Sequence, residues 1–228
     1  MSEEIIKRGL ERGWLLEPEA KELCRIYGLS VGEWRVVKDL DGMKCAVEEL
    51  GFPLVMKIVS PDVLHKSDVG GVILNIDSEE KALNSFLKIK EIAEKGGYKL
   101  DGVLLERMAP QGVETIIGAK RDPQFGPVLM FGLGGIFVEV FKDVSFRVAP
   151  IGKNDAMEMV SELKAYPILR GIRGRKPSDI NSIVDAIVKV SEMMMELPQI
   201  SEIDLNPTIA YEVGYKIVDA RILLKKGQ

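Results

Sequence analysis

Residues 54–76 form the stretch that most narrows the folds open to this chain. Two apolar runs, LVMKIV and VILNI, flank a polar segment that ends in Gly70-Gly71. Short apolar runs bounded by glycine and polar residues predict two strands joined by a loop. The loop contains His65, which is the only histidine in the sequence. We therefore expect a strand, a loop with chemically active side chains and a second strand.

Lys57 lies inside the first of these apolar runs. Burying an ammonium group is unfavourable unless an opposite charge faces it. Two interpretations remain open: Lys57 binds a phosphate, or its side chain reaches solvent from a half-buried strand. Two interpretations of His65 also remain open. A lone histidine is more often structural than catalytic, but a neutral imidazole in a glycine-containing loop is also a competent phosphoryl acceptor.

The rest of the sequence alternates between patterns typical of helices and of strands. Apolar residues at helical spacing predict helices at 17–27, 42–50 and 79–97, and Ser178 is expected to cap a further long helix. A short buried strand is expected at 103–106. Antiparallel pairs are expected between VETIIGAK and PVLMFG and between IFVEVF and SFRVAP. A final hairpin is expected to turn near residues 212–214.

Pro110 and Gly112 interrupt the apolar pattern, so we expect a boundary between two lobes within residues 97–112. The predicted fold class is α/β (α+β), with a mainly antiparallel or mixed sheet and packed helices in each lobe. The lobes are expected at 1–100, with the first helix and the His65 loop, and at 101–228. A length of 228 residues suits one domain or two compact lobes.

Composition argues against several classes of protein. The net charge is −4 with both signs spread along the chain, so no basic stripe for nucleic acid is present. Cys24 and Cys45 fall among apolar helix positions and are expected to be reduced and buried. The N-terminal sequence lacks a signal-peptide core, and no stretch approaches the ~20 apolar residues of a membrane span. We expect a cytoplasmic protein.

Arg147 is a further candidate for binding a phosphoryl group. Its guanidinium is always charged and suits bidentate contact with phosphate oxygens. It could equally pair with Asp143 or Glu139. The glycine-rich FGLGGIF segment nearby matches neither the Rossmann nor the Walker spacing, so alone it does not identify a nucleotide site.

Three segments carry a resemblance to a known family. They are KIVSPDVLHKSDVGGV, LLERMAPQGVETIIGAKRDPQFGPVLMFGLGGIFVEVFKDVSFRVAPI and EIDLNPTIA. Together they resemble the beta subunit of ADP-forming acetyl-CoA synthetase (ADP-forming acetate–CoA ligase), which is an ATP-grasp protein. The likeness covers nearly the whole chain. It implies an ATP-grasp fold in which Mg-ATP or Mg-ADP lies between the two lobes.

The resemblance implies roles for the nucleotide-binding residues. Lys57 would contact phosphate, Glu106 and Met108 would contact adenine, and Glu114 would bind the ribose. From the residues alone, Glu106 is equally a surface carboxylate at a strand end and Glu114 a polar residue of an alternating strand.

The resemblance likewise implies a magnesium site and catalytic residues. Asn206 and Asp219 would hold the metal, which favours oxygen donors. Without the family, Asn206-Pro207 reads as a turn and Asp219 as a cap. Asp204 stands where the family usually has glutamate. Catalytic roles are expected for His65, Arg147 and Asp204. His65 would relay a phosphoryl group or bind phosphate.

The implied activity interconverts acyl-CoA, ADP and phosphate with carboxylate, ATP and CoA. In the family, a histidine of the alpha subunit is phosphorylated, and the phosphoryl group is carried to the nucleotide site of the beta subunit. This chain contains no strand–GxGxxG–helix unit, so a CoA-binding alpha subunit is the expected partner, in an alpha2beta2 heterotetramer. Two alternatives stay open: an ATP-grasp carboxylate–amine ligase, and a non-catalytic nucleotide-binding regulatory module.

Overall fold

The computed structural model describes residues 1–225 apart from 136, 137, 139, 141, 173 and 175. The chain forms two compact units, each with its own antiparallel sheet, helices and apolar core. Unit 1 comprises Met1–Val31 and Gln111–Gln228, and unit 2 comprises Gly32–Pro110. The predicted class, with helices and mainly antiparallel sheets in two lobes, is confirmed.

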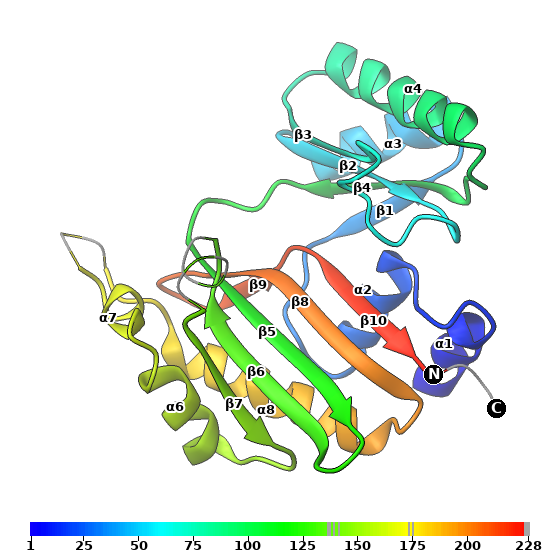
Figure 1. Cartoon of the computed structure of the whole chain (residues 1–228). Coiled ribbons are helices and arrows are strands. Elements are labelled where there is room, and N and C mark those ends of the chain that lie inside the picture. Colours follow the sequence, from blue (N-terminus) through cyan, green and yellow to red (C-terminus); the bar gives the residue numbers. More distant parts are fainter. Residues whose placement is uncertain (136–137, 139, 141, 173, 175, 226–228) are drawn as a thin grey trace. The chain divides into compact units, whose positions relative to one another are not determined.

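Unit 2 is a sheet with helices packed on one face (Figure 1). In chain order its elements are β1 (Trp34–Val37), α3 (Leu40–Leu50), β2 (Leu54–Val59), β3 (Val72–Ile76), α4 (Glu79–Gly96) and β4 (Gly102–Arg107). The strand order is β1-β4-β2-β3, and each neighbouring pair is antiparallel. Met56 and Ile58 of β2 join Leu105 of β4 in the core beneath α3 and α4. Because side chains alternate along a strand, Lys57 and Glu106 lie on the other face.

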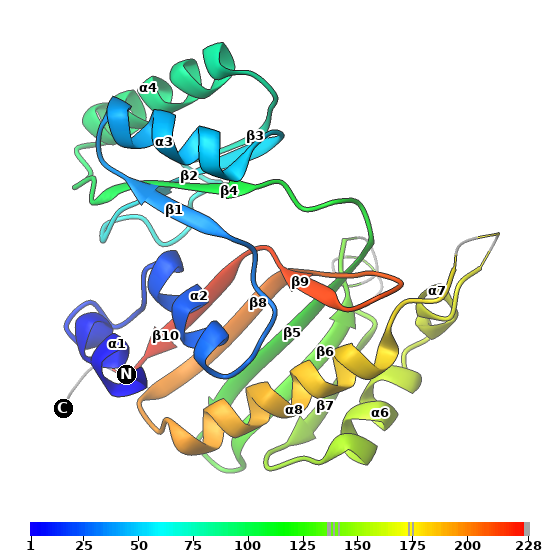
Figure 2. The same ribbon diagram turned by 180° about the vertical axis from the view of Figure 1, so that it is seen from behind.

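Unit 1 contains a larger sheet, and α8 crosses one of its faces (Figure 2). Its elements are α1 (Ser2–Leu10), α2 (Glu17–Ile26), β5 (Val113–Asp122), β6 (Gly126–Leu133), β7 (Val144–Val148), α6 (Lys153–Ser161), α7 (Tyr166–Leu169), α8 (Ile180–Glu196), β8 (Ile200–Ala210), β9 (Tyr215–Ile217) and β10 (Ala220–Leu224). The strand order is β10-β8-β5-β6-β7, with β9 also paired to β8. The core lies between α6, α8 and the facing side chains of the sheet.

The bounds of the units differ from the predicted lobes at both ends. The first 31 residues belong to unit 1, because Ile5, Ile6 and Leu23 are buried in its core and the N–H of Leu15 donates to the carbonyl of Ile222. Residues 101–110 belong to unit 2, because β4 pairs with both β1 and β2. The division at residue 100 is therefore corrected, although the second boundary falls within the expected interval of 97–112.

The strand predictions are confirmed where they rest on adjacent segments. β2 and β3 flank the His65 loop, β5 pairs with β6, and β8 turns back into β9. The expected IFVEVF strand lies largely outside the described residues. The SFRVAP segment forms β7 as expected, and β7 pairs with β6.

Asp179, rather than the predicted Ser178, caps α8. Its Oδ1 accepts from the backbone N–H of Ser182 at 3.1 Å, and its Oδ2 accepts from the Ser182 hydroxyl at 2.6 Å. The same Oδ2 accepts from the N–H of Gly214 at 2.9 Å, in the turn before β9. The carboxylate therefore ties the start of α8 to the β8–β9 hairpin.

Replacing Asp179 by alanine is expected to lower the free energy of unfolding by about 1–2 kcal/mol, the usual effect of losing a helix cap. The hydrogen bonds from Ser182 and Gly214 hold the pKa of Asp179 below its ordinary value. Its stabilisation is therefore complete above the unfolded pKa of about 4 and is lost as the pH falls through the lower folded pKa. Denaturant unfolding at pH 7 and pH 3 should show the difference from wild type shrinking at pH 3.

The matched control for this prediction is Asp39→Ala. Asp39 caps α3, where its Oδ1 accepts from the N–H of Gly42 at 2.8 Å. Because the Asp39 cap is exposed, its removal should have a smaller effect than removal of the cap that also contacts Gly214. An equal loss in the two variants would contradict a role for the hairpin contact.

The two cysteines are free, and only one matches the expected burial. Cys24 is buried in unit 1, which raises the pKa of its thiol to about 12. Cys45 is exposed, because the core-facing residues of α3 are Met43, Ala46 and Val47 and position 45 lies on the other side of the helix. Among the residues that the structure describes, no helix has the length and apolar character needed to cross a membrane.

Candidate functional site

Lys57 and Glu106 form a buried ion pair on the helix-free face of unit 2. The Lys57 Nζ lies 2.6 Å from Oε1 of Glu106, and the two side chains are 3% and 6% exposed. They come from neighbouring strands, with Lys57 of β2 opposite Leu104 and Val55 opposite Glu106. The sequence placed a lysine in an apolar strand, and the tertiary structure supplies its counter-charge.

This pair decides one of the questions left open by the sequence. Lys57 does not extend into solvent, because its side chain is almost fully buried. A buried charge persists only beside an opposite charge or a comparable polar group. Glu106 fills that role in this chain and fixes the position of the Lys57 side chain. A fixed cation of this kind can also bind a phosphate oxygen.

The end of β4 places Met108 beside the same strand. Its backbone N–H donates to the carbonyl of Pro53 at 2.8 Å, so the segment after β4 is held against the start of β2. Glu106, two residues earlier, is thereby fixed in both position and direction. The predicted nucleotide-binding residues Lys57, Glu106 and Met108 thus come together within unit 2.

His65 is exposed in the loop that connects β2 to β3. Val63 is buried in the core of unit 2, and Oδ2 of Asp62 accepts from the backbone N–H of Lys99 at 2.7 Å, which anchors the first part of the loop. At the other end, the N–H of Gly71 donates to the carbonyl of Lys66 at 2.7 Å. The loop is therefore tied down on both sides of His65.

The glycine pair Gly70-Gly71 is explained by close packing and backbone conformation. A Cβ at Gly71 would lie 2.4 Å from Cγ2 of Ile58, which is too close for any side chain. Gly70 has a φ of +70°, in the left-handed region that glycine favours. These glycines allow the loop to return closely over β2, which sets where His65 is presented.

Residues from β8 and β10 gather on the helix-free face of unit 1. Arg221 lies directly opposite Asp204 in the antiparallel pair, and its Nη2 lies 2.9 Å from Oδ2 of Asp204. Beyond Asp204, the backbone N–H of Asn206 donates to the carbonyl of Asp219 at 3.2 Å. Asp204, Asn206 and Asp219, which the sequence singled out, are therefore neighbours in the fold.

The pKa of Asp204 depends on its burial and on the charged groups around it. Partial burial raises the pKa of its carboxyl group above the ordinary value. The guanidinium of Arg221 lowers the pKa in part, while the nearby carboxylates of Asp219 and Glu202 add to the rise. Arg221 was not predicted as a site residue. Its signal in the sequence was its position two residues after Asp219, in a strand where apolar and polar residues alternate.

Glu114 is exposed near the start of β5, the strand next to β8. Its backbone carbonyl accepts from the N–H of Gly134 at 2.7 Å. A Cβ at Gly134 would lie 3.0 Å from Cβ of Glu114, so a glycine allows this close approach. Glu114 and Gly118 are on the same side of β5, and Gly118 lies opposite Asp204. Glu114 thus shares the face that carries Asp204.

Arg147 is a predicted site residue of unit 1 that lies on the opposite face of the sheet from Asp204. It lies opposite Leu129, whose side chain is buried in the core beneath the helices. The Arg147 guanidinium makes a bidentate ion pair with Glu162 at 3.0 and 2.8 Å, just after α6. This pair raises the pKa of Arg147 and lowers that of Glu162. The structure therefore gives Arg147 a carboxylate partner, and its contact with a phosphoryl group stays a prediction.

The oxygen donors of unit 1 are consistent with a magnesium ion that arrives with a nucleotide. In the described parts of the chain, no group of three or more His, Cys, Asp or Glu side chains is placed to hold a metal. Asn206 and Asp219 supply an amide and a carboxylate oxygen, which suit magnesium. Since magnesium usually keeps waters and binds substrate phosphates, two protein donors are sufficient.

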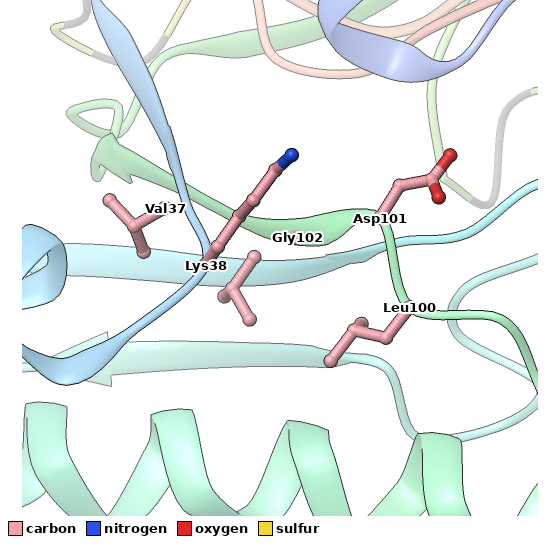
Figure 3. Close-up of a pocket in the computed structure, with 6 residues that line it drawn as sticks. Val37, Lys38, Leu100, Asp101 and Gly102 are labelled. Atoms are coloured by element: carbon pink, nitrogen blue, oxygen red, sulfur yellow. The ribbon is translucent and has the colours of Figure 1, made fainter.

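A separate cavity of about 440 Å³ occurs in unit 2 (Figure 3). It is lined by Val37, Lys38, Leu100, Asp101, Gly102 and Val103. None of the predicted site residues lines this cavity, so it is not assigned to the candidate site.

Comparison with known proteins identifies the class to which this fold belongs. The family model described as an ATP-grasp domain matches residues 6–224. The beta subunit of ADP-forming acetate–CoA ligase I from Pyrococcus furiosus is 53% identical over 226 residues, which cover 97% of each chain. The chain belongs to the family of ATP-grasp beta subunits of ADP-forming acetate–CoA ligases.

Solved structures are similar over the same length. An acetyl-coenzyme A synthetase of Ca. Korarchaeum cryptofilum, in complex with coenzyme A and Ca-AMPCP, has a TM-score of 0.94 and 48% identity, with 99% of this chain and 100% of that chain covered. Another structure of that enzyme, with coenzyme A and Mg-AMPPCP, has a TM-score of 0.86 and 47% identity at the same coverage. It is described as having a phosphohistidine segment that points towards the nucleotide-binding site.

Proposed function

We propose that this chain is the nucleotide-binding beta subunit of an ADP-forming acyl-CoA synthetase. With an alpha partner it would convert acyl-CoA, ADP and phosphate to carboxylate, ATP and CoA, and the reverse. The observation that carries the proposal is the 53% identity, over 97% of both chains, to a beta subunit of this activity. The ion pair of Lys57 with Glu106 and the grouping of Asp204, Asn206 and Asp219 support it.

The residues of unit 2 would bind the nucleotide. The fixed ammonium of Lys57 would donate a hydrogen bond to a phosphate oxygen and offset its negative charge. Hydrogen bonds between two charged groups are among the stronger hydrogen bonds in proteins. Glu106 and the backbone around Met108 would contact the adenine edge. Glu114, from unit 1, is assigned to the ribose hydroxyls, which a carboxylate accepts as hydrogen-bond donors.

Asn206 and Asp219 would hold the magnesium ion of the bound nucleotide. Once bound there, magnesium would neutralise negative charge on the phosphate oxygens of the nucleotide. The protein's own contribution at this position is to keep two oxygen donors on neighbouring segments, joined by the hydrogen bond between Asn206 and Asp219.

His65 would relay the phosphoryl group between the partner and ADP. In the ATP-forming direction the N–P bond of the partner's phosphohistidine would break as an N–P bond forms to His65. The N–P bond of His65 would then break as an O–P bond forms to the terminal phosphate oxygen of ADP. The ring nitrogen that loses the phosphoryl group takes up a proton, which leaves a neutral imidazole, so no reactant other than this proton is required. Asp204 would lie beside the incoming phosphohistidine, where a carboxylate can orient an imidazole N–H.

The partner is proposed to be a CoA-binding alpha subunit, in an alpha2beta2 assembly. The relative is a subunit by name, and this chain has no GxGxxG unit that would mark a dinucleotide-type domain of its own. We place the complex in the cytoplasm, which agrees with two free cysteines.

The test is incubation of the complex with its alpha partner and γ-labelled ATP, followed by acid treatment. The proposal expects label on protein that is stable in base and lost in acid, as for phosphohistidine, and its transfer to ADP on chase. A carboxylate–amine ligase would release labelled phosphate only with an amine present. A regulatory module would bind nucleotide without any label on protein. Either result would reject the proposal.

A further inference from the structure

Arg221 is placed to hold the carboxylate of Asp204 in one orientation. Its Nη2 lies 2.9 Å from Oδ2 of Asp204 and 3.7 Å from Oε1 of Glu202. The two partners Arg221 and Asp204 are each 28% exposed, so the contact is partly shielded from water. The strand register reinforces the contact, because Arg221 and Asp204 are directly opposite in the pair of β10 and β8.

The surroundings of Arg221 contain several acidic groups. Asp204, Asp219 and Glu202 lie close enough for their charges to interact, and like charges repel. The Nζ of Lys120 in β5 lies 3.8 Å from the other carboxylate oxygen of Glu202, Oε2. Among the residues that the structure describes, Arg221 is thus the cation that contacts Asp204 directly. Without it, the Asp204 side chain would be free to turn away from its acidic neighbours.

The position of Arg221 on the sheet argues against a purely structural purpose. Its neighbours Ala220 and Ile222 face the core, so the Arg221 side chain extends from the opposite, helix-free face. A partly exposed ion pair there contributes little to folding stability. Two neighbouring charged side chains on the face that carries Asn206 and Glu114 are better explained by the chemistry at that face.

We propose that Arg221 is a positioning residue for phosphoryl transfer. It fixes the orientation of the Asp204 carboxylate towards the phosphohistidine of the alpha partner. This inference rests on the proposed function and deepens it. Arg221 acts through Asp204 and does not itself touch the nucleotide. Since a misplacement of about 1 Å can lower a rate about 100-fold, loss of the guanidinium should lower kcat much more than it changes KM.

The experiment measures ATP formation from acyl-CoA, ADP and phosphate by the complex with the alpha partner. Arg221→Met is expected to lower kcat by about 10- to 100-fold with the KM for ADP changed less than about threefold. Arg221→Lys, which keeps the positive charge, should recover part of that loss. Melting temperatures of the variants show that each is folded.

Arg12→Met is the matched control, because Arg12 forms an ion pair with Glu19 outside the sheet, with side chains 22% and 14% exposed. It removes an arginine–carboxylate pair of similar burial from the same unit and should leave kcat unchanged. If Arg221→Met behaved like this control, or if Arg221→Lys recovered nothing, the inference would be overturned.

A double-mutant cycle tests the route through Asp204. Asp204→Asn combined with Arg221→Met should be no slower than Asp204→Asn alone, because a residue that acts through another has no effect once the other is lost. Independent, multiplicative losses would reject the inference while the wild-type complex remains active. If the wild-type complex itself formed no ATP, the proposed function would fail instead, so the two failures are distinguishable.

Discussion

Replacing Lys57 by methionine is expected to weaken ADP binding at least about tenfold, the loss of one charge-assisted contact. It should also lower the free energy of unfolding by about 3–5 kcal/mol, as does removal of one partner from a buried ion pair. The reason is that the carboxylate of Glu106 would remain buried without the ammonium that contacts it at 2.6 Å. Calorimetry with Mg-ADP and denaturant unfolding measure the two effects.

Two further variants separate binding from stability. Lys57→Met combined with Glu106→Leu removes both charges, so stability should largely recover while ADP binding stays weak. Lys21→Met is the matched control, because Lys21 is fully buried in α2 with its Nζ 3.0 Å from Oε1 of Glu17. It should destabilise the protein similarly and leave the affinity of the folded protein for ADP unchanged. Wild-type affinity in Lys57→Met would contradict the assignment of Lys57.

Replacing His65 by asparagine is expected to reduce ATP formation by the complex by about 10³-fold or more, as does loss of a residue that carries a covalent intermediate. Asparagine is polar and similar in size but has no ring nitrogen to carry the phosphoryl group. ADP affinity should stay within about threefold of wild type, because binding is assigned to Lys57 and its neighbours rather than to His65. Rate measurements and calorimetry on the same preparation provide both values.

Ser67→Ala serves as the control for His65. Ser67 is exposed in the same loop. Its backbone carbonyl accepts a hydrogen bond from the N–H of Gly70 at 3.1 Å, which the substitution would keep. The substitution should leave the rate unchanged. If His65→Asn kept full activity, the relay would be ruled out, and the ATP-grasp carboxylate–amine ligase would regain support as the alternative.

Arg147 and Arg221 show how register decides which charged residues can act together. Both lie in strands of mixed polarity at the edges of the unit 1 sheet. Arg147 pairs opposite core-facing Leu129, whereas Arg221 pairs opposite Asp204. A shift of one residue in either pairing would exchange the two faces. The sequence pattern therefore identified charged strand residues without showing which of them face the proposed nucleotide.

Local pattern alone determined much of this protein. Apolar period, helix-capping residues and turn glycines predicted β2, the His65 loop and β3, as well as α2, α4 and the pairing of β5 with β6. These features depend on residues that are close in the sequence. The quoted segments, from Lys57 to Ala210, likewise indicated the ATP-grasp family, because a resemblance over so much of the chain is specific.

Only the tertiary structure decided features that depend on distant residues. The first 31 residues join unit 1 because their apolar side chains complete its core, and β4 joins unit 2 because it is paired on both sides. The contacts of Lys57 with Glu106 and of Arg221 with Asp204 follow from strand register. Register and burial are settled by packing of the whole chain, so no local pattern of residues contains them.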